Sequence, residues 1–175
     1  MKIRKYLLLI LLIAIPTKSY SLIEVDITRG NLNPLPIAVS PLSSDQKSII
    51  ALEKELGIKN IESEISKVVE NNLRQSGLFN PLDKGAFLQN PDIAHHKPRF
   101  EDWALIKSQA LITGKVSFED EKLRVEFRLW DVLAGKEMLA LAFTTVPKNW
   151  RRVGHIITDK VYERLTGEKG YFDTR

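Results

Sequence analysis

The stretch that decides the fold is ALITGKVSFEDEKLRVEFRLWDVLAGKEMLALAFTTV, residues 110–146. Over residues 122–129 apolar and charged side chains alternate strictly, and a period of two is typical of a strand with one buried and one solvated face. Apolar runs at 110–118 and 138–146 flank it, with a turn at 131–135. Neighbouring strands joined by short turns pair in antiparallel fashion, so we predict a three-stranded meander.

Helical periodicity takes over on both sides of the meander. Apolar residues at 61, 65, 68, 69 and 73 fall on one helical stripe, with Asn60 as a possible N-cap and Gly77 as a stop. A shorter amphipathic stretch lies at 49–56, before Gly57, and a last helix runs from Trp150 to Gly167.

The connecting segments carry weaker signals. The apolar run 37–39, bounded by prolines, predicts a short strand. Residues 80–98 hold three prolines and a glycine, so we expect mostly loop with one short extended piece at 86–88. Residues 101–108 predict a short helix whose inward side chains are Trp103, Leu105 and Ile106.

The order strand, helix, helix, three strands, helix predicts an α+β fold. We expect a two-layer sandwich, with the helices packed on the single apolar face of a mixed, mainly antiparallel sheet. The chain of 175 residues contains no cysteine, which excludes disulfides, thiolate catalysis and cysteine-based zinc sites.

The first 21 residues have the pattern of a secretory signal peptide. Three basic residues precede an apolar run over residues 6–15, and Ser19-Tyr20-Ser21 offers small residues for cleavage after Ser21. Ten apolar residues reach about 15 Å as a helix, half of a ~30 Å bilayer core. We therefore expect export to the periplasm, no membrane span after cleavage, and a mature chain that begins at Leu22.

The formal charge of +4 comes from this leader. Four of the 26 basic residues and none of the 22 acidic residues lie in it, so the remainder is neutral. A neutral chain lacks the basic surface that drives nucleic acid binding, and no nucleic acid partner is expected.

Two groups of residues have the chemistry of a catalytic or metal site. Asp92, His95 and His96 are metal-ligand types, but adjacent histidines rarely converge on one ion, and a solvated loop is the favoured interpretation. His155 and Asp159 lie one helical turn apart, yet no Cys, Gly-x-Ser-x-Gly motif or serine on a sharp turn supplies a nucleophile. We predict no catalytic residue, no metal and no cofactor.

Charged clusters point to internal pairing. Arg151 and Arg152 open a helix, where cations oppose the macrodipole, so we expect an internal acidic partner, with an interface as the alternative. A mixed-sign face on the middle strand predicts cross-strand ion pairs in solvent; it comprises Lys122, Arg124, Glu126 and Arg128.

Several stretches carry more specific motifs. Residues 150–175, WRRVGHIITDKVYERLTGEKGYFDTR, contain Arg-x-Gly-His and then Leu-Thr-Gly-Glu-x-Gly-x-Phe-x-Thr-Arg. DWALIKSQALITGKV (102–116), NLRQSGLFNP (72–81) and PIAVSPL (36–42) follow the same order as in one family. Together they resemble the amino-terminal domain of the periplasmic TolB proteins.

This resemblance implies a protein–protein interaction component of the Tol-Pal system, which supports outer-membrane integrity and acts at cell division. In TolB proteins the extreme N-terminus, opening with Glu-Val-x-Ile, engages TolA. The matching residues here are Glu24, Val25, Asp26 and Ile27, preceded by Leu22 and Ile23. An extended, alternating segment of this kind can add to the edge of a partner's sheet.

The resemblance also sets the expected organisation. It gives a signal peptide (1–21), a partner-binding segment and connector (22–34), an α+β domain (35–170), and the start of the family's β-propeller (171–175). In the family that propeller carries the main surface for Pal, and this sequence stops at Arg175, where the propeller would begin, so we do not expect propeller-based binding of Pal. The alternatives are a periplasmic hydrolase that uses His155 and Asp159, and a truncated remnant that binds nothing.

Overall fold

The three predicted meander strands are the longest in the sheet. In the computed structural model, which describes residues 23–25 and 33–174, they are β4 (Ala110–Glu119), β5 (Lys122–Asp131) and β6 (Lys136–Thr145). β4 and β5 are joined by the two-residue turn Asp120-Glu121, in which both residues have positive φ. Such turns match the twist of paired strands, and the antiparallel meander is confirmed.

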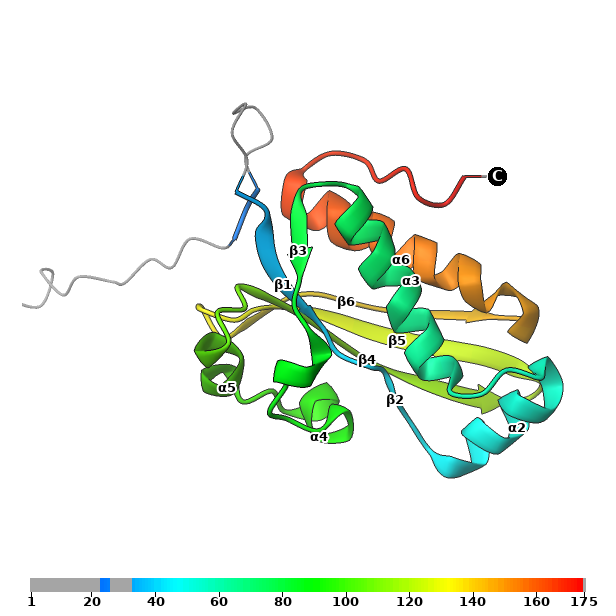
Figure 1. Ribbon diagram of the computed structural model, residues 1–175. Coiled ribbons are helices and arrows are strands. Elements are labelled where there is room, and N and C mark those ends of the chain that lie inside the picture. Colours follow the sequence, from blue (N-terminus) through cyan, green and yellow to red (C-terminus); the bar gives the residue numbers. More distant parts are fainter. Residues whose placement is uncertain (1–22, 26–32, 175) are drawn as a thin grey trace, which may run out of the picture.

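Parallel strands extend the sheet on the other side of β4. β1 (Leu35–Val39) pairs in parallel with both β4 and β3 (Phe79–Pro81), and the short β2 (Ser43–Ser44) also pairs with β4. The order is β3-β1-β4-β5-β6 (Figure 1). The sheet is mixed, and its three longest strands are antiparallel, as predicted.

Three helices occupy the predicted ranges: α2 (Gln46–Leu56), α3 (Ile61–Gln75) and α6 (Trp150–Thr166). Gly57 and Gly167 end α2 and α6 with positive φ. Asn60 lies at the predicted N-cap of α3, but its side chain makes no capping bond. Its backbone carbonyl instead accepts the amides of Ser63 and Glu64.

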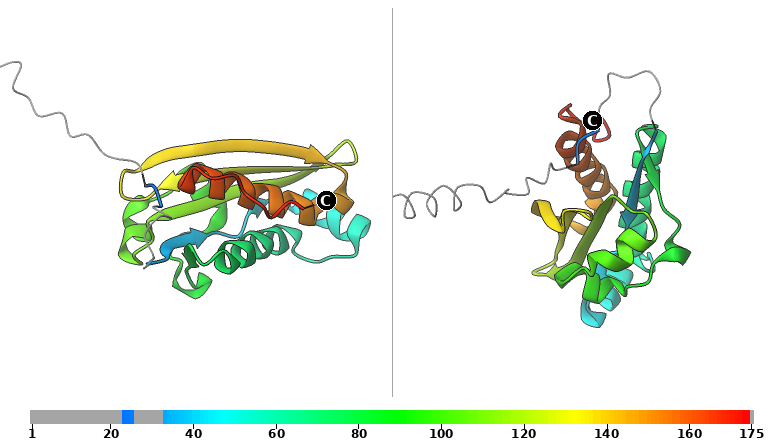
Figure 2. Two further views of the ribbon diagram at one scale, coloured as in Figure 1. Left: turned by 90° about the horizontal axis from the view of Figure 1, so that it is seen from above. Right: turned by 90° about the vertical axis from the view of Figure 1, so that its left-hand side faces the viewer.

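The main core lies between one face of the sheet and the helices α3 and α6, which run side by side (Figures 1 and 2). The apolar stripe of α3 is buried throughout, and so are the alternating residues Leu123, Val125, Phe127 and Leu129 of β5. The α+β class, with helices packed on a mixed sheet, is therefore confirmed.

The second face of the sheet is also partly covered, which differs from the prediction of a single apolar face. Two short helices, α4 (Pro91–His96) and α5 (Phe100–Leu105), lie apart from α3 and α6 (Figure 1). Five buried residues form a small separate cluster on this face: Ala38, Ala94, Trp103, Leu111 and Val132. Leu111 lies on this side because it alternates with Ala110 and Ile112, which belong to the main core.

The segment predicted as loop (80–98) is more regular than expected. It holds the end of β3, the short 3₁₀ helix η1 (Lys84–Ala86) and α4, and no strand forms at 86–88. α4 begins where the Asn90 side chain accepts the amide of Asp92, with Pro91 at the first helical position, and this start signal outweighs the proline content. In α5, Trp103 is buried as predicted, but Leu105 is 74% exposed.

After α6, residues 167–174 turn back along that helix (Figure 1). The Asp159 carboxylate accepts the amides of Phe172 and Asp173, at 2.7 and 3.0 Å, and Tyr162 packs edge-on against Tyr171 and Phe172. Gly170 fits here because a Cβ would lie 2.3 Å from the Asp159 Oδ1. A second 3₁₀ turn, η2 (Pro147–Asn149), leads from β6 into α6.

Candidate functional site

The candidate site is the segment Ile23–Val25, the described part of the predicted partner-binding stretch. Its backbone is held at two points: the Ile23 amide donates to Asp131 Oδ2 at 3.1 Å, and the Val25 amide donates to the Leu165 carbonyl at 2.7 Å. Because amides two residues apart point to the same side of an extended chain, one edge of the segment is bound to the body of the protein.

Asp131, the last residue of β5, is the first of these anchors. Its side chain is 1% exposed, and its second oxygen accepts the amide of Ala134 at 2.8 Å in the turn before β6. A buried carboxylate needs such donors to offset its desolvation. One side chain therefore fixes both the β5–β6 turn and the N-terminal segment.

The second anchor is the free carbonyl end of α6. The last four carbonyls of a helix have no partner within it. That of Glu163 accepts the amide of Gly167, and that of Leu165 accepts the amide of Val25. Because α6 ends at Gly167, the Leu165 carbonyl has no partner within the helix and can accept the Val25 amide of the N-terminal segment.

The side chains of the segment alternate as the sequence predicts. Ile23 and Val25 are half-buried against the main core, whereas Glu24 is exposed. Leu22, Asp26 and Ile27, the other predicted site residues, lie outside the described residues.

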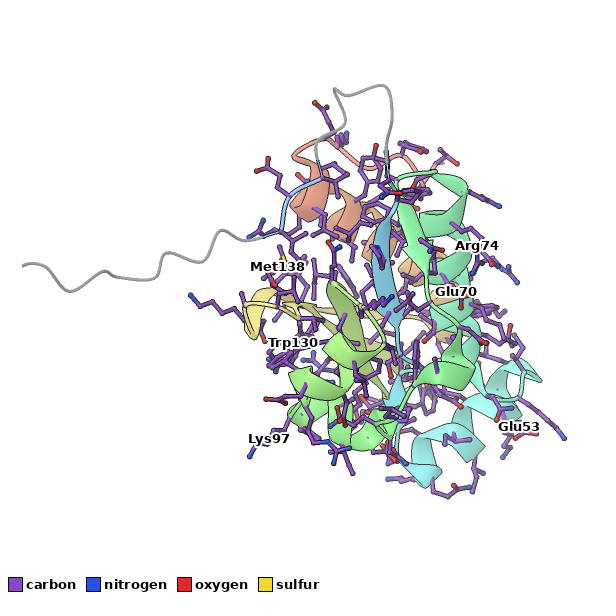
Figure 3. The ribbon with its side chains drawn as sticks, turned by 60° about the vertical axis from the view of Figure 1, so that its left-hand side comes forward. Glu53, Glu70, Arg74, Lys97, Trp130 and Met138 are labelled. Carbon is purple, nitrogen blue, oxygen red and sulfur yellow. The ribbon has the colours of Figure 1, made fainter. Side chains whose placement is uncertain are left out.

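Beside the segment, a groove of about 650 Å³ runs between β6 and α6. Its lining combines Leu139 and Leu141 of β6 with the charged side chains of Lys160, Glu163 and Arg164. Lys160 and Glu163 pair at 2.9 Å, and the Arg164 guanidinium donates to the carbonyl of Met138, a residue labelled in Figure 3. β6 is the outermost strand on this side of the sheet (Figure 2).

The contacts of the segment with Asp131 and Leu165 are not predictable from the sequence. The sequence places Asp131 at the start of a turn and Leu165 near a helix end. The sequence does not indicate that the Asp131 carboxylate is buried and therefore needs hydrogen-bond donors. This becomes clear only in the fold, where the segment Ile23–Val25 lies beside it.

The structure gives His155 and Asp159 separate partners. The His155 Nδ1 lies 2.9 Å from the amide nitrogen of Asn72 on α3, while Asp159 accepts the two amides of the C-terminal segment. Each side chain thus has a structural contact of its own, and the geometry gives no support to a catalytic pair.

The group of Asp92, His95 and His96 lies on helix α4 rather than in the solvated loop that we predicted. His96 is exposed, whereas His95 is buried. Among residues 23–25 and 33–174, no group of three or more acidic or histidine side chains is placed to hold a metal ion.

The predicted internal partner of the α6 arginines exists for one of them. The Arg152 guanidinium binds Asp173 through two nitrogens, at 3.0 Å each, and this pair raises the pKa of Arg152. Arg151 instead lies over the ring of Trp150. On β5, Arg124 pairs with Glu126 of the same strand, which differs from the predicted cross-strand pairing, whereas Arg128 pairs with Glu137 of β6 across the strands, as predicted.

Within the part of the chain that the structure describes, no helix has the length and apolarity needed to span a membrane.

Comparison with known proteins agrees with these features. Residues 23–138 match the family model of the TolB amino-terminal domain. The Tol-Pal system protein TolB of Pelagibacter ubique (strain HTCC1062) is 79% identical over 168 residues, which are 96% of this chain and 38% of that protein. The crystal structure of TolB from Acinetobacter baumannii superimposes with a TM-score of 0.64 at 21% identity, over 86% of this chain and 33% of that one.

The chain thus spans little more than a third of the length of the relative that it matches at 79% identity. The fold, the motifs quoted above and the family match lead to one conclusion. This chain belongs to the TolB family and corresponds to its amino-terminal domain.

Proposed function

We propose that the chain acts without catalysis as a periplasmic component of the Tol-Pal system, and that residues 22–27 form its binding segment for TolA. Through this contact it would support outer-membrane integrity and envelope invagination at cell division. One observation carries the proposal: apolar and charged side chains alternate over Ile23, Glu24 and Val25. The apolar side chains of Ile23 and Val25 pack against the core, and the backbone amides of the same two residues donate hydrogen bonds.

The segment has the properties that addition to a partner's sheet requires. Backbone hydrogen bonds would supply affinity, and the alternate apolar side chains would supply specificity. In the described state, the edge that carries the Ile23 and Val25 amides is occupied by Asp131 and Leu165. A partner strand on that edge must replace these two bonds, and the cost of reordering the segment predicts a modest affinity.

The direct test is deletion of residues 22–28, followed by calorimetric measurement of the affinity for purified TolA. We expect binding to be lost. An unchanged affinity would contradict the proposal. Circular dichroism and thermal unfolding of the deleted protein establish that the body, residues 33–174, remains folded.

A matched set of substitutions separates the contribution of the apolar side chains to the affinity for TolA from that of the backbone. Ile23→Ser and Val25→Ser remove the apolar side chains and should weaken binding at least tenfold each. Glu24→Gln changes the exposed neighbour between them and should leave the affinity within about twofold. Equal losses in all three variants would mean that the alternation does not select the partner.

The proposed location rests on the leader sequence. We propose export and cleavage after Ser21, so that mature protein from the periplasmic fraction should begin at Leu22. Mass spectrometry of that fraction tests this, and a chain that keeps its first 21 residues in the cytosol would contradict it.

A further inference from the structure

His95 is a titratable group in an unusual position. Its side chain is 4% exposed on the inner side of α4, and its Nδ1 has no hydrogen-bond partner among the described residues. The neighbouring His96 ring is exposed, with its centroid 4.7 Å from that of His95. A neutral imidazole tolerates such a site, because an unused acceptor nitrogen costs far less than an unpaired buried charge.

The charged groups around His95 are mostly cationic. His96 comes from the same helix, Lys115 from β4, and Arg128 and Glu126 from β5. Glu126 is the one group that favours the imidazolium, and its carboxylate is already engaged by Arg124 at 3.0 Å. A proton on His95 would therefore meet both desolvation and net repulsion.

The segment that carries His95 is held to the sheet by a small set of contacts. We call residues 89–106 the α4–α5 unit. Its internal link is the buried side chain of Gln89, which donates to the Lys97 carbonyl and accepts from the Arg99 amide and the Trp103 indole. Its attachment to the sheet is the five-residue cluster around Trp103 and Leu111, with the half-buried Ile106 and Trp130 packed against it and Phe100 edge-on to Trp130. A unit with few buried apolar contacts can open without global unfolding.

We propose that His95 makes the α4–α5 unit acid-labile, so that uptake of one proton by its imidazole releases the unit from the sheet while the main core stays folded.

The pH range follows from the two states of the imidazole. In the closed state, burial first, and then His96, Arg128 and Lys115, lower the pKa of His95 below 6.5. In the open state the pKa returns to about 6.5. Because the open state binds the proton more tightly, the closed unit has its full stability above pH ~6.5 and loses it as the pH falls. One proton gives an increase in the opening constant of up to about tenfold per pH unit.

Hydrogen exchange with mass spectrometry tests this directly. Amide exchange would be measured at pH 7.5 and 5.5, with labelling times scaled to the intrinsic rates. We expect opening within residues 89–106 to rise by up to about tenfold at pH 5.5, with no change in α3 and α6. Equal protection of residues 89–106 at both pH values would overturn the proposal.

Two variants assign the effect to one side chain. His95→Gln cannot take up the proton and should lose the pH dependence, whereas His96→Gln, the exposed neighbour, should keep it. An acid response that persists in His95→Gln would refute the assignment. If His95→Gln does not fold, NMR titration of the wild-type imidazole decides: a pKa at or above 6.5 in the closed state contradicts the proposal.

Discussion

The two faces of the sheet are packed to very different depths. One face is covered by α3 and α6 along its length, and the buried side chains of both helices and of β4 and β5 form a single cluster. The other face carries α4 and α5 over a cluster of five buried residues. Between the two helices of the first face, the Asn72 amide donates to the Thr158 hydroxyl at 3.1 Å.

From this difference we expect the first face to determine whether the chain folds, and the second face to open without unfolding the chain. Burial contributes roughly 25 cal/mol per Å² of apolar surface, so the face with few buried side chains has little stability to lose before it opens. The adjacent residues Leu111 and Ile112 allow a direct comparison, because both are fully buried on β4 but point to opposite faces.

Ile112→Ala should have the largest effect. Removing a buried isoleucine side chain costs roughly 2–5 kcal/mol, and a site fixed between sheet and helices relaxes little, so we expect a value near the top of this range. Urea unfolding measures it, and the m-value should not change. A loss below about 1 kcal/mol would mean that the main core is loosely packed at this strand.

Leu111→Ala should cost less, near the bottom of the same range. The α4–α5 unit can move to close the cavity, or open, so its own stability limits the loss. Hydrogen exchange should therefore increase in residues 89–106 and stay unchanged in α3. If both alanine variants lose equal stability and exchange globally, the two faces form one cooperative unit.

The sequence predicted the well-packed face because its signals are periodic. The alternation of β5 and the stripe of α3 each repeat over many residues, so every buried position supports the same assignment. Of the α4–α5 unit, the sequence predicts only the short helix at 101–108, and it misses α4 and the packing of the unit on the sheet, because six-residue helices show less than two turns of periodicity. Its burial depends on single contacts, such as that of Gln89 with the Trp103 indole, which join residues 14 apart.

The sequence predicts which residues form the candidate site, but not where on the folded domain they dock. The alternation of residues 22–27 marks an extended piece, and the family resemblance gives it a partner. The docking of Ile23 to Asp131, 108 residues away, depends on the finished fold. No local pattern encodes which buried carboxylate meets which amide.

Gly154→Ala tests how closely the helices approach on the main face. A Cβ at residue 154 would lie 2.8 Å from Val68 Cγ1 on α3. Alanine is favoured over glycine within a helix by about 1 kcal/mol, but overpacking costs roughly 1–3 kcal/mol, so we expect a net loss of about 1 kcal/mol.

The double variant Gly154→Ala/Val68→Ala provides the control. Val68→Ala removes Cγ1, which would lie 2.8 Å from the new Cβ, but keeps the Val68 Cβ, which would lie at 2.9 Å. The clash is relieved only in part, so the two single losses should sum to somewhat more than the loss of the double variant. Strict additivity in urea unfolding would show that the α3–α6 contact has room for the added carbon.

Asp45→Ala, at the N-cap of α2, should have the smallest effect. Asp45 Oδ1 accepts the Ser48 amide and Oδ2 accepts the Ser48 hydroxyl, both at 2.9 Å, while Ser48 Oγ accepts the Phe118 amide of β4. Loss of such an N-cap costs about 1 kcal/mol. Urea unfolding at pH 7 measures the difference.

The same cap has a pH dependence that distinguishes the two faces. The Ser48 amide and hydroxyl lower the pKa of Asp45 from 3.8, so its contribution is complete above pH ~3.8 and is lost as the pH falls through the lower folded value. Asp45→Asn keeps a capping side chain without a charge, and it should not show this loss between pH 4 and 2. Acid should therefore act on the α4–α5 unit first, below pH ~6.5, and on the α2 cap only some three pH units lower. A single acid transition that removes both contacts together would mean that the two faces are not independent.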